Sequence, residues 1–104
     1  MDLSKSEIRT MLNAETGRLG WPELERHFAR GVLVKVAAGY DLIEVATHLV
    51  QDDKPAVEAW LEEGVLGRAT SLDAMDWQGR APEFWAVVVA PWVLVQEAEQ
   101  PAVN

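Results

Sequence analysis

Apolar residues recur at helical spacing in the first third of the chain. Ser4 and Glu7 have the spacing of a capping box, and the apolar positions that follow form one face of a helix that Gly17 is placed to end. Pro22 suits the first turn of a second helix, which Gly31 is placed to end. The pattern therefore predicts two short amphipathic helices before residue 32.

Helical spacing returns in the middle of the chain. Asp41 with Glu44 signals the start of a third helix, and Pro55 suits the first turn of a fourth helix that ends at Gly64. The remaining signals predict a short fifth helix, with a cap at Thr70 or Ser71, apolar positions at Leu72 and Met75, and a break over 79–82.

Strand patterns lie between these helices and near the C-terminus. Residues 32–37 alternate between two faces, and 65–69 is either a short strand or a loop. The run from Phe84 to Val95 has no charged side chain over twelve positions. It is too short to span a membrane and is typical of a buried strand, or of a strand broken at Pro91. We expect an α+β fold in which a small, mainly antiparallel β-sheet is covered by several α-helices.

Length and composition indicate one domain in a reducing compartment. The chain has 104 residues and no cysteine, which excludes disulfides and thiolate metal sites. We expect a single domain over 1–104, with an ordered core over about 4–97 and a polar tail over 98–104. The N-terminal residues have no apolar signal region, so we expect a cytoplasmic protein.

The charge of the chain is negative and unevenly distributed. The formal net charge is −8, and residues 1–30 are balanced, with five basic and five acidic side chains, so the rest of the chain carries the excess. Phosphate backbones bind clustered Lys and Arg, so Arg18, Arg26 and Arg30 are a weak basis for nucleic-acid binding. We expect neither a nucleic-acid nor a membrane partner.

The first candidate ligand set surrounds His48. Glu44 precedes it by four residues and Asp52 follows it by four, so all three lie along one helical face. Imidazole and carboxylates bind zinc or manganese, but three groups spread over about 12 Å of helix cannot all reach one ion. The pattern favours the alternative, a solvated polar stripe, and we expect no metal site.

The remaining polar residues form no catalytic set. His27 has Glu23 one turn before it and Arg30 three residues after it, without a plausible nucleophile nearby. The acidic pairs at 52–53 and 62–63 lie at predicted helix ends, where carboxylates are common. The seven glycines form no nucleotide-binding motif. We therefore expect no catalytic residue and no cofactor, and the case for an enzyme is weak.

The chain has five tryptophans, many for its length. Core packing explains most of them, but we expect one or two to be partly exposed. Trp92 follows Pro91, which cannot donate a ladder hydrogen bond, so we expect an edge strand or a bulge there. An apolar edge would pair with another chain. The sequence thus predicts a homodimer, with candidate interface residues Trp21, Arg30, Trp85, Pro91 and Trp92.

Five motifs resemble those of one protein family. They are Trp21-x-Glu23-Leu24, Phe28-Ala29-Arg30-Gly31, the segment 41–46 (DLIEVA), Val57-x-x-Trp60-Leu61, and the ending 85–97 (WAVVVAPWVLVQE). With these motifs, which span roughly residues 12–97, the chain resembles a family of short bacterial proteins catalogued as a domain of unknown function. The resemblance implies a proteobacterial, cytoplasmic protein and carries over no site.

Two hypotheses from different classes follow. The first is a non-enzymatic interaction module that acts as a homodimer and docks on an unidentified protein. The alternative is a small-molecule or metal-binding protein, a class that includes enzymes, with a pocket near His27 and His48 supported by Glu44 and Asp52. The alternative requires these residues to converge in one pocket.

Overall fold

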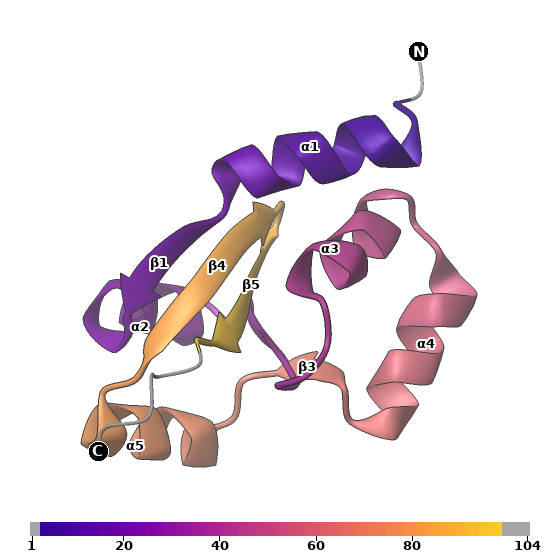
Figure 1. Cartoon of the computed structure of the whole chain (residues 1–104). Coiled ribbons are helices and arrows are strands. Elements are labelled where there is room, and N and C mark those ends of the chain that lie inside the picture. Colours follow the sequence, from indigo (N-terminus) through magenta and orange to yellow (C-terminus); the bar gives the residue numbers. More distant parts are fainter. Residues whose placement is uncertain (1–2, 99–104) are drawn as a thin grey trace.

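The computed structural model describes residues 3–98, and the strands in this part of the chain form one sheet (Figure 1). The strands are β1 (Gly17–Gly20), β2 (Leu33–Val36), β3 (Leu66–Arg68), β4 (Glu83–Val89) and β5 (Trp92–Glu97), in the spatial order β1-β4-β5-β2-β3. All neighbouring strands are antiparallel except β2 and β5, which are parallel. The predicted α+β fold with a mainly antiparallel sheet is confirmed.

Helices cover both faces of this sheet. They are α1 (Lys5–Glu15), α2 (Trp21–Ala29), α3 (Leu42–Val50), α4 (Lys54–Glu63) and α5 (Ser71–Arg80). α1, α3 and α4 lie on one face, and α2 and α5 lie on the other (Figure 1). The sheet is therefore the middle layer of three.

Each face of the sheet has its own hydrophobic core because successive strand side chains point to opposite faces. On β5, Leu94 belongs to the first core, against α1, α3 and α4, while Val95 belongs to the second core, against α2 and α5. Both side chains are fully buried. Phe84 and Trp77 pack edge to face in the second core, with ring centroids 5.0 Å apart. Adjacent residues of one strand thus hold both layers of helices.

The predicted helix ends at Ser4, Asp41 and Gly64 are confirmed. The Ser4 side chain accepts from the Glu7 amide, and the Glu7 side chain reaches back to the Ser4 amide, which completes the capping box of α1. Asp41 caps α3 by accepting from two backbone amides. Gly64 ends α4 in the left-handed conformation, with φ of 76°, which glycine adopts without the steric penalty of a Cβ atom.

Two elements differ from the prediction. Gly17, expected to end the first helix, instead begins the edge strand β1 (Gly17–Gly20). The segment has no apolar alternation, and its pairing with β4 makes it a strand. On α5, Leu72 and Met75 are 77% and 70% exposed, so the helix does not pack through them. It packs through Trp77 instead, which faces the second core.

The apolar C-terminal run forms a hairpin, which matches the predicted strand broken at Pro91. Val89 pairs with Trp92, so Ala90 and Pro91, which are joined by a cis peptide bond, form the turn. The prediction that β5 is an edge strand is wrong, because Pro91 lies outside the ladder and β5 runs between β4 and β2. Over residues 3–98, no helix has the length and apolar character needed to cross a membrane. The predicted tail falls almost wholly outside the described residues.

Candidate functional site

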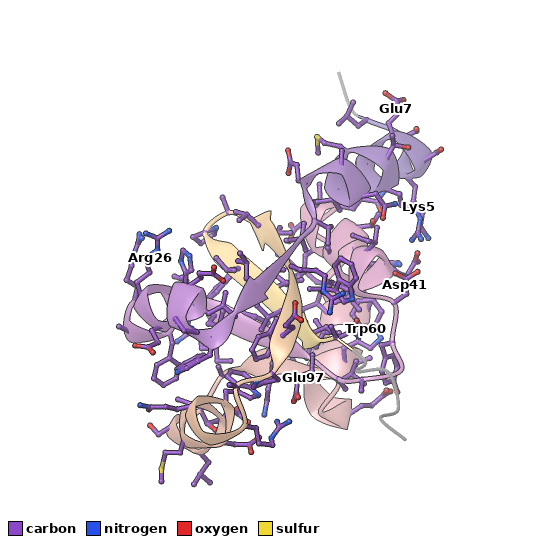
Figure 2. All side chains as sticks on the ribbon, turned by 60° about the vertical axis from the view of Figure 1, so that its left-hand side comes forward. Lys5, Glu7, Arg26, Asp41, Trp60 and Glu97 are labelled. Atoms are coloured by element: carbon purple, nitrogen blue, oxygen red, sulfur yellow. The ribbon has the colours of Figure 1, made fainter. Side chains whose placement is uncertain are left out.

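An ion-pair network joins α1 to α3. At its centre, Glu44 Oε1 accepts from Lys5 Nζ at 2.8 Å and lies 2.9 Å from His48 Nε2, while Oε2 pairs with Arg9. Arg9 also pairs with Asp41 at 3.2 Å. Figure 2 shows Lys5 and Asp41 on the same side of the molecule. The hydrogen bond from Lys5, followed by that from His48, lowers the pKa of Glu44 to about 2.

Both ring nitrogens of His48 lie against carboxylates. Nε2 is 2.9 Å from Glu44 and Nδ1 is 2.7 Å from Asp53, whose pKa is lowered mainly by this hydrogen bond. The ring also packs edge to face on Trp60, at 5.2 Å between centroids. His48 thereby ties α4 and its preceding turn to α3.

The candidate ligand residues do not converge. Asp52 lies in the exposed turn after α3, with φ of 55°, and Asp53 takes the contact with His48 that the spacing suggested for Asp52. His27 is on α2, so it lies on the opposite side of the sheet from His48 on α3. Among residues 3–98, no group of three or more His, Asp and Glu side chains is arranged to hold a metal ion. The pocket expected near the two histidines does not combine them.

Trp21 belongs to the second core and not to a surface. It is 6% exposed and lies between Phe28 and Trp77, with ring centroids 5.8 Å and 5.7 Å away. Its buried Nε1 has no hydrogen-bond partner among the described residues. Trp21 was a candidate interface residue because aromatic side chains are common at interfaces, but its packing against Phe28 of its own helix and Trp77 of α5 removes it from the surface.

The other candidate interface residues remain at least partly accessible. Trp85 is 40% exposed, and the Arg18 guanidinium lies 5.0 Å from its ring. Trp92 is half-buried against the first core, and the Arg68 guanidinium lies 5.0 Å from its ring. Arg30 is exposed at the end of α2. Arg30 follows α2, on the opposite side of the sheet from Trp92, so the candidate residues do not form one surface.

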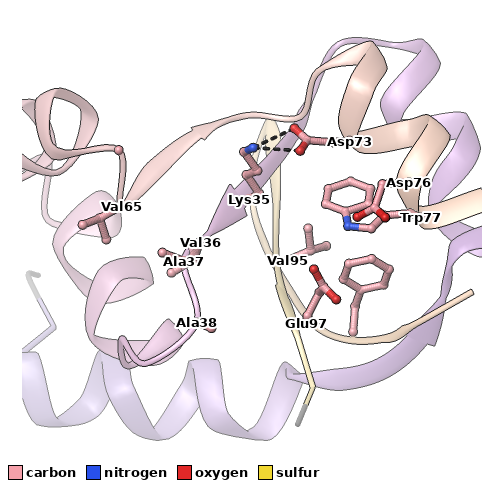
Figure 3. Close-up of a pocket in the computed structure, with 12 residues that line it drawn as sticks. Lys35, Val36, Ala37, Ala38, Val65, Asp73, Asp76, Trp77, Val95 and Glu97 are labelled. Carbon is pink, nitrogen blue, oxygen red and sulfur yellow. Dashed lines mark hydrogen bonds and ion pairs between the residues drawn. The ribbon is translucent and has the colours of Figure 1, made fainter. Parts of the chain in front are cut away.

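A charged hollow of about 220 Å³ opens beside α5 (Figure 3). Its floor includes Trp77 and Val95, and on its rim Lys35 pairs with Asp73 at 2.8 Å. Burial raises the pKa of Asp73, but the hydrogen bonds from Lys35 and Thr70 outweigh it, so the net pKa is lowered. The chain itself therefore neutralises the central charges of this hollow.

Arg80 pairs the remaining carboxylates of the rim. Its guanidinium donates to Asp76 at 2.6 and 2.7 Å and to Glu97 at 2.9 and 3.1 Å. This arrangement lowers the pKa of Asp76 and raises that of Arg80. A charged ligand could enter the hollow only by exchanging with these ion pairs, which makes the hollow a weak candidate for a binding site.

A second hollow, of about 270 Å³, is mostly apolar and lies between α4 and the sheet edge. We call it the α4–β3 groove; it is lined by Val34, Leu49, Val57, Leu61, Leu66, Gly67, Arg68 and Trp92. Leu61 is 52% exposed, although it follows Trp60, which packs against the first core. No side chain of α4 is fully buried. The helix therefore presents apolar surface that the described part of the chain leaves uncovered.

The edge strand β3 borders this groove, and some of its backbone N–H and C=O groups have no partner within the described residues. The Val65 carbonyl accepts from the Ala37 amide at 2.8 Å, and the Ala69 amide donates to the Leu33 carbonyl at 3.0 Å. Because hydrogen-bonding direction alternates along an antiparallel strand, Gly67 also faces β2. Leu66 and Arg68 then direct their N–H and C=O groups away from the sheet, where no other strand lies within the described residues. An unpaired edge beside an apolar groove can bind an extended polypeptide.

Sequence reasoning missed most of this groove. Trp60 and Leu61 are neighbours in one of the sequence motifs, but Trp60 packs against the first core and Leu61 lines the groove. One signal could have indicated it: the segment 65–69 is a short strand pattern that follows a helix with several apolar residues. The edge position of β3 depends on the whole strand order, which the pattern does not give.

The comparisons with known proteins agree with this fold. The family model described as "Protein of unknown function (DUF2288)" matches residues 7–97, which confirms the expected resemblance to a family of unknown function. The chain is 44% identical to PA1075 from Pseudomonas aeruginosa, whose NMR solution structure has a TM-score of 0.79 to this one. The match covers 100% of this chain and 97% of that chain. No curated protein matches the chain.

Proposed function

The chain belongs to the DUF2288 family of proteins of unknown function, and we propose that it acts as a non-enzymatic module that binds an extended, apolar segment of polypeptide in the α4–β3 groove. The observation that carries the proposal is the combination of the outward backbone groups of Leu66 and Arg68 with the exposed apolar side chain of Leu61. Backbone hydrogen bonds would supply affinity, and the groove would select apolar side chains.

The lining of the groove supports a polypeptide over a small polar ligand. Its side chains are apolar except for Arg68, and that guanidinium lies over the Trp92 ring at 5.0 Å. Trp and Arg are enriched among residues that dominate binding energy. The charged hollow beside α5, by contrast, has Lys35, Asp73, Asp76 and Glu97 paired within the chain. The geometry thus favours the interaction class over the alternative, a ligand pocket near His27 and His48.

A peptide-display screen tests this proposal. A library of unstructured peptides would be selected on the immobilised full chain and on Leu61→Glu, which places a carboxylate in the groove. Leu72→Glu is the matched control, because Leu72 is an exposed leucine on α5, away from the groove. We expect peptides that bind the wild type and Leu72→Glu but bind Leu61→Glu at least about tenfold more weakly, a loss of about 1.4 kcal/mol.

Three results would contradict the proposal. One is a screen that enriches no peptide on the wild type. Another is a set of peptides that bind Leu61→Glu as well as they bind the wild type. The third is a selective loss on Leu72→Glu, since it would place the binding surface on α5.

A further inference from the structure

The two edges of the sheet are not equivalent. On β4, the Glu83 carbonyl accepts from the Ala98 amide, so the backbone groups of Glu83 point toward β5 and those of the next residue point toward β1. The residues of β4 that point toward β1 are paired with Leu19 and Gly17. Arg18 and Gly20 alternate with these two residues and therefore direct their backbone groups outward, away from the sheet. The outward amide of Gly20 already donates to Glu23 Oε2 at 2.6 Å. Within residues 3–98, the outward N–H and C=O groups of Leu66 and Arg68 on β3 make no hydrogen bond. β3 is therefore the edge with its outward groups still available.

A second copy of the chain fits this edge by symmetry. If two β3 strands lie antiparallel with Gly67 facing Gly67 across a two-fold axis, Leu66 of one copy lies opposite Arg68 of the other. These are the two residues whose backbone groups point outward, so all of them find partners. Gly67 has no side chain, and a Cβ atom built on it would meet nothing within 4 Å, so the centre of the contact is open. The register uses every outward group of β3.

The charges near the groove are also self-complementary. Among the described residues, Arg68 is the only basic residue that lines the groove, and α4 beside it carries Glu58, Glu62 and Glu63 against the single basic residue Lys54. The two-fold axis runs between the two Gly67 residues and is perpendicular to the sheet. It therefore places both α4 helices on the same face of the joined sheets. Each copy then brings its Arg68 toward the acidic α4 of the other copy.

The size of the contact decides which groups must take part. Pairing of a three-residue strand buries far less surface than the roughly 800 Å² that each partner buries in a stable complex. The rest of the contact must come from α4, whose apolar residues Val57 and Leu61 line the groove and of which no side chain is fully buried. Pairing of β3 thus positions the two helices, and their apolar faces contribute most of the affinity.

We propose that the polypeptide bound in the α4–β3 groove is a second copy of this chain, joined through β3 around a two-fold axis at Gly67 into a continuous ten-stranded sheet. This inference rests on the proposed function and names the partner of the same groove. It replaces the predicted contact through β5, whose two edges are already paired with β4 and β2. Trp92 still takes part, because it lines the groove.

Sedimentation of the full chain and of three variants tests the inference. Arg68→Pro removes the arginine side chain and the outward N–H, which is a change that an edge strand tolerates. Arg68→Ala removes the same side chain but keeps that N–H. Arg18→Pro is the matched control at the other edge, since Arg18 also follows a glycine, directs its N–H outward and stacks on a tryptophan. We expect wild type, Arg68→Ala and Arg18→Pro to form dimers as concentration rises. Arg68→Pro should need at least about tenfold higher concentration than Arg68→Ala.

Hydrogen exchange provides a readout that needs no variant to fold. With rising concentration of the wild type, the amides of Leu66 and Arg68 should exchange more slowly, while that of Gly67, already bonded within the sheet, should not change. A chain that stays monomeric at all concentrations would overturn the inference, as would a dimer that is lost in Arg18→Pro but retained in Arg68→Pro. If the chain is monomeric but peptides still bind in a Leu61-dependent way, the second copy is wrong and the proposed function stands. If neither occurs, both are wrong.

Discussion

At the scale of single residues, Glu44 pairs with residues of a second helix that its helical spacing did not indicate. The spacing joined it to His48 and Asp52 on one helix, but its partners Lys5 and Arg9 come from α1, far away in sequence. Glu44 is a point where two helices meet, and its carboxylate is partly shielded between them. Its chemistry is therefore better tested through folding than through ligand binding.

The stability of the protein should depend on the charge of Glu44 at acidic pH. The pKa of Glu44 is about 2 in the folded chain, below the ordinary value of 4.5. The folded state therefore binds this proton less tightly than the unfolded state, so the stabilisation is complete above pH 4.5 and is lost as the pH falls towards 2. In urea unfolding at a series of pH values, we expect the difference between wild type and Glu44→Gln to shrink across that window.

The control for this measurement is Glu62→Gln on α4, because Glu62 has no ion-pair partner among the described residues. Its difference from the wild type should stay nearly constant over the same pH range. Asp53, Asp73 and Asp76 also have lowered pKa values, so the wild-type profile alone does not isolate Glu44. A Glu44→Gln difference that does not change between pH 4.5 and 2 would contradict the assignment.

At the scale of elements, local signals determined the helices and long-range pairing determined the sheet. The caps at Ser4, Asp41 and Gly64 act through neighbouring residues, so the pattern alone located the helix ends. β1 has no such signal, since Gly17 to Gly20 is a strand only because β4 lies beside it. The wrong position expected for β5 has the same origin, because a proline beside a strand does not tell whether it lies in the ladder or in a turn.

In the candidate site too, local signals indicated single residues, while long-range pairing determined how they are arranged. His48, Glu44 and Trp92 were singled out from their residue types, and each makes specific contacts. The α4–β3 groove depends on which strand lies at the edge, and that is a property of the complete strand order. Leu61 and Trp60 are neighbours in one sequence motif, but only the packing of α4 on α3 decides which of them remains exposed.

Gly64 offers a test of how α4 is joined to β3. Its φ of 76° is left-handed, so Gly64→Ala should lower the free energy of unfolding by about 1 kcal/mol. Gly79→Ala is the matched control, because Gly79 lies inside α5 with space around a Cβ atom, and alanine should stabilise that helix by about 0.5–1 kcal/mol. Chemical unfolding of both variants measures whether each substitution lowers or raises the free energy of unfolding. Equal effects would show that the conformation of Gly64 is not what limits substitution.

At the scale of the whole molecule, one sheet connects two cores, and this sets how the protein should unfold. Leu94 and Val95 are neighbours on β5, are both fully buried and belong to different cores. Loss of either side chain disturbs the strand that both layers share. A small single domain usually unfolds in one step, so we expect the first and second cores to be lost together.

Leu94→Ala and Val95→Ala test this cooperativity. We expect Leu94→Ala to lower the free energy of unfolding by about 2–5 kcal/mol, with a smaller but clear loss for Val95→Ala. Fluorescence reports tryptophans of both cores, since Trp60 and Trp92 pack on the first and Trp21 and Trp77 on the second. The fluorescence and circular dichroism transitions should coincide in each variant.

Val88→Ala, at a 57% exposed position on β4, is the control and should change the free energy of unfolding by less than about 0.5 kcal/mol. Separate transitions in Leu94→Ala and Val95→Ala would mean that the two helical layers unfold independently, despite the strand that joins them.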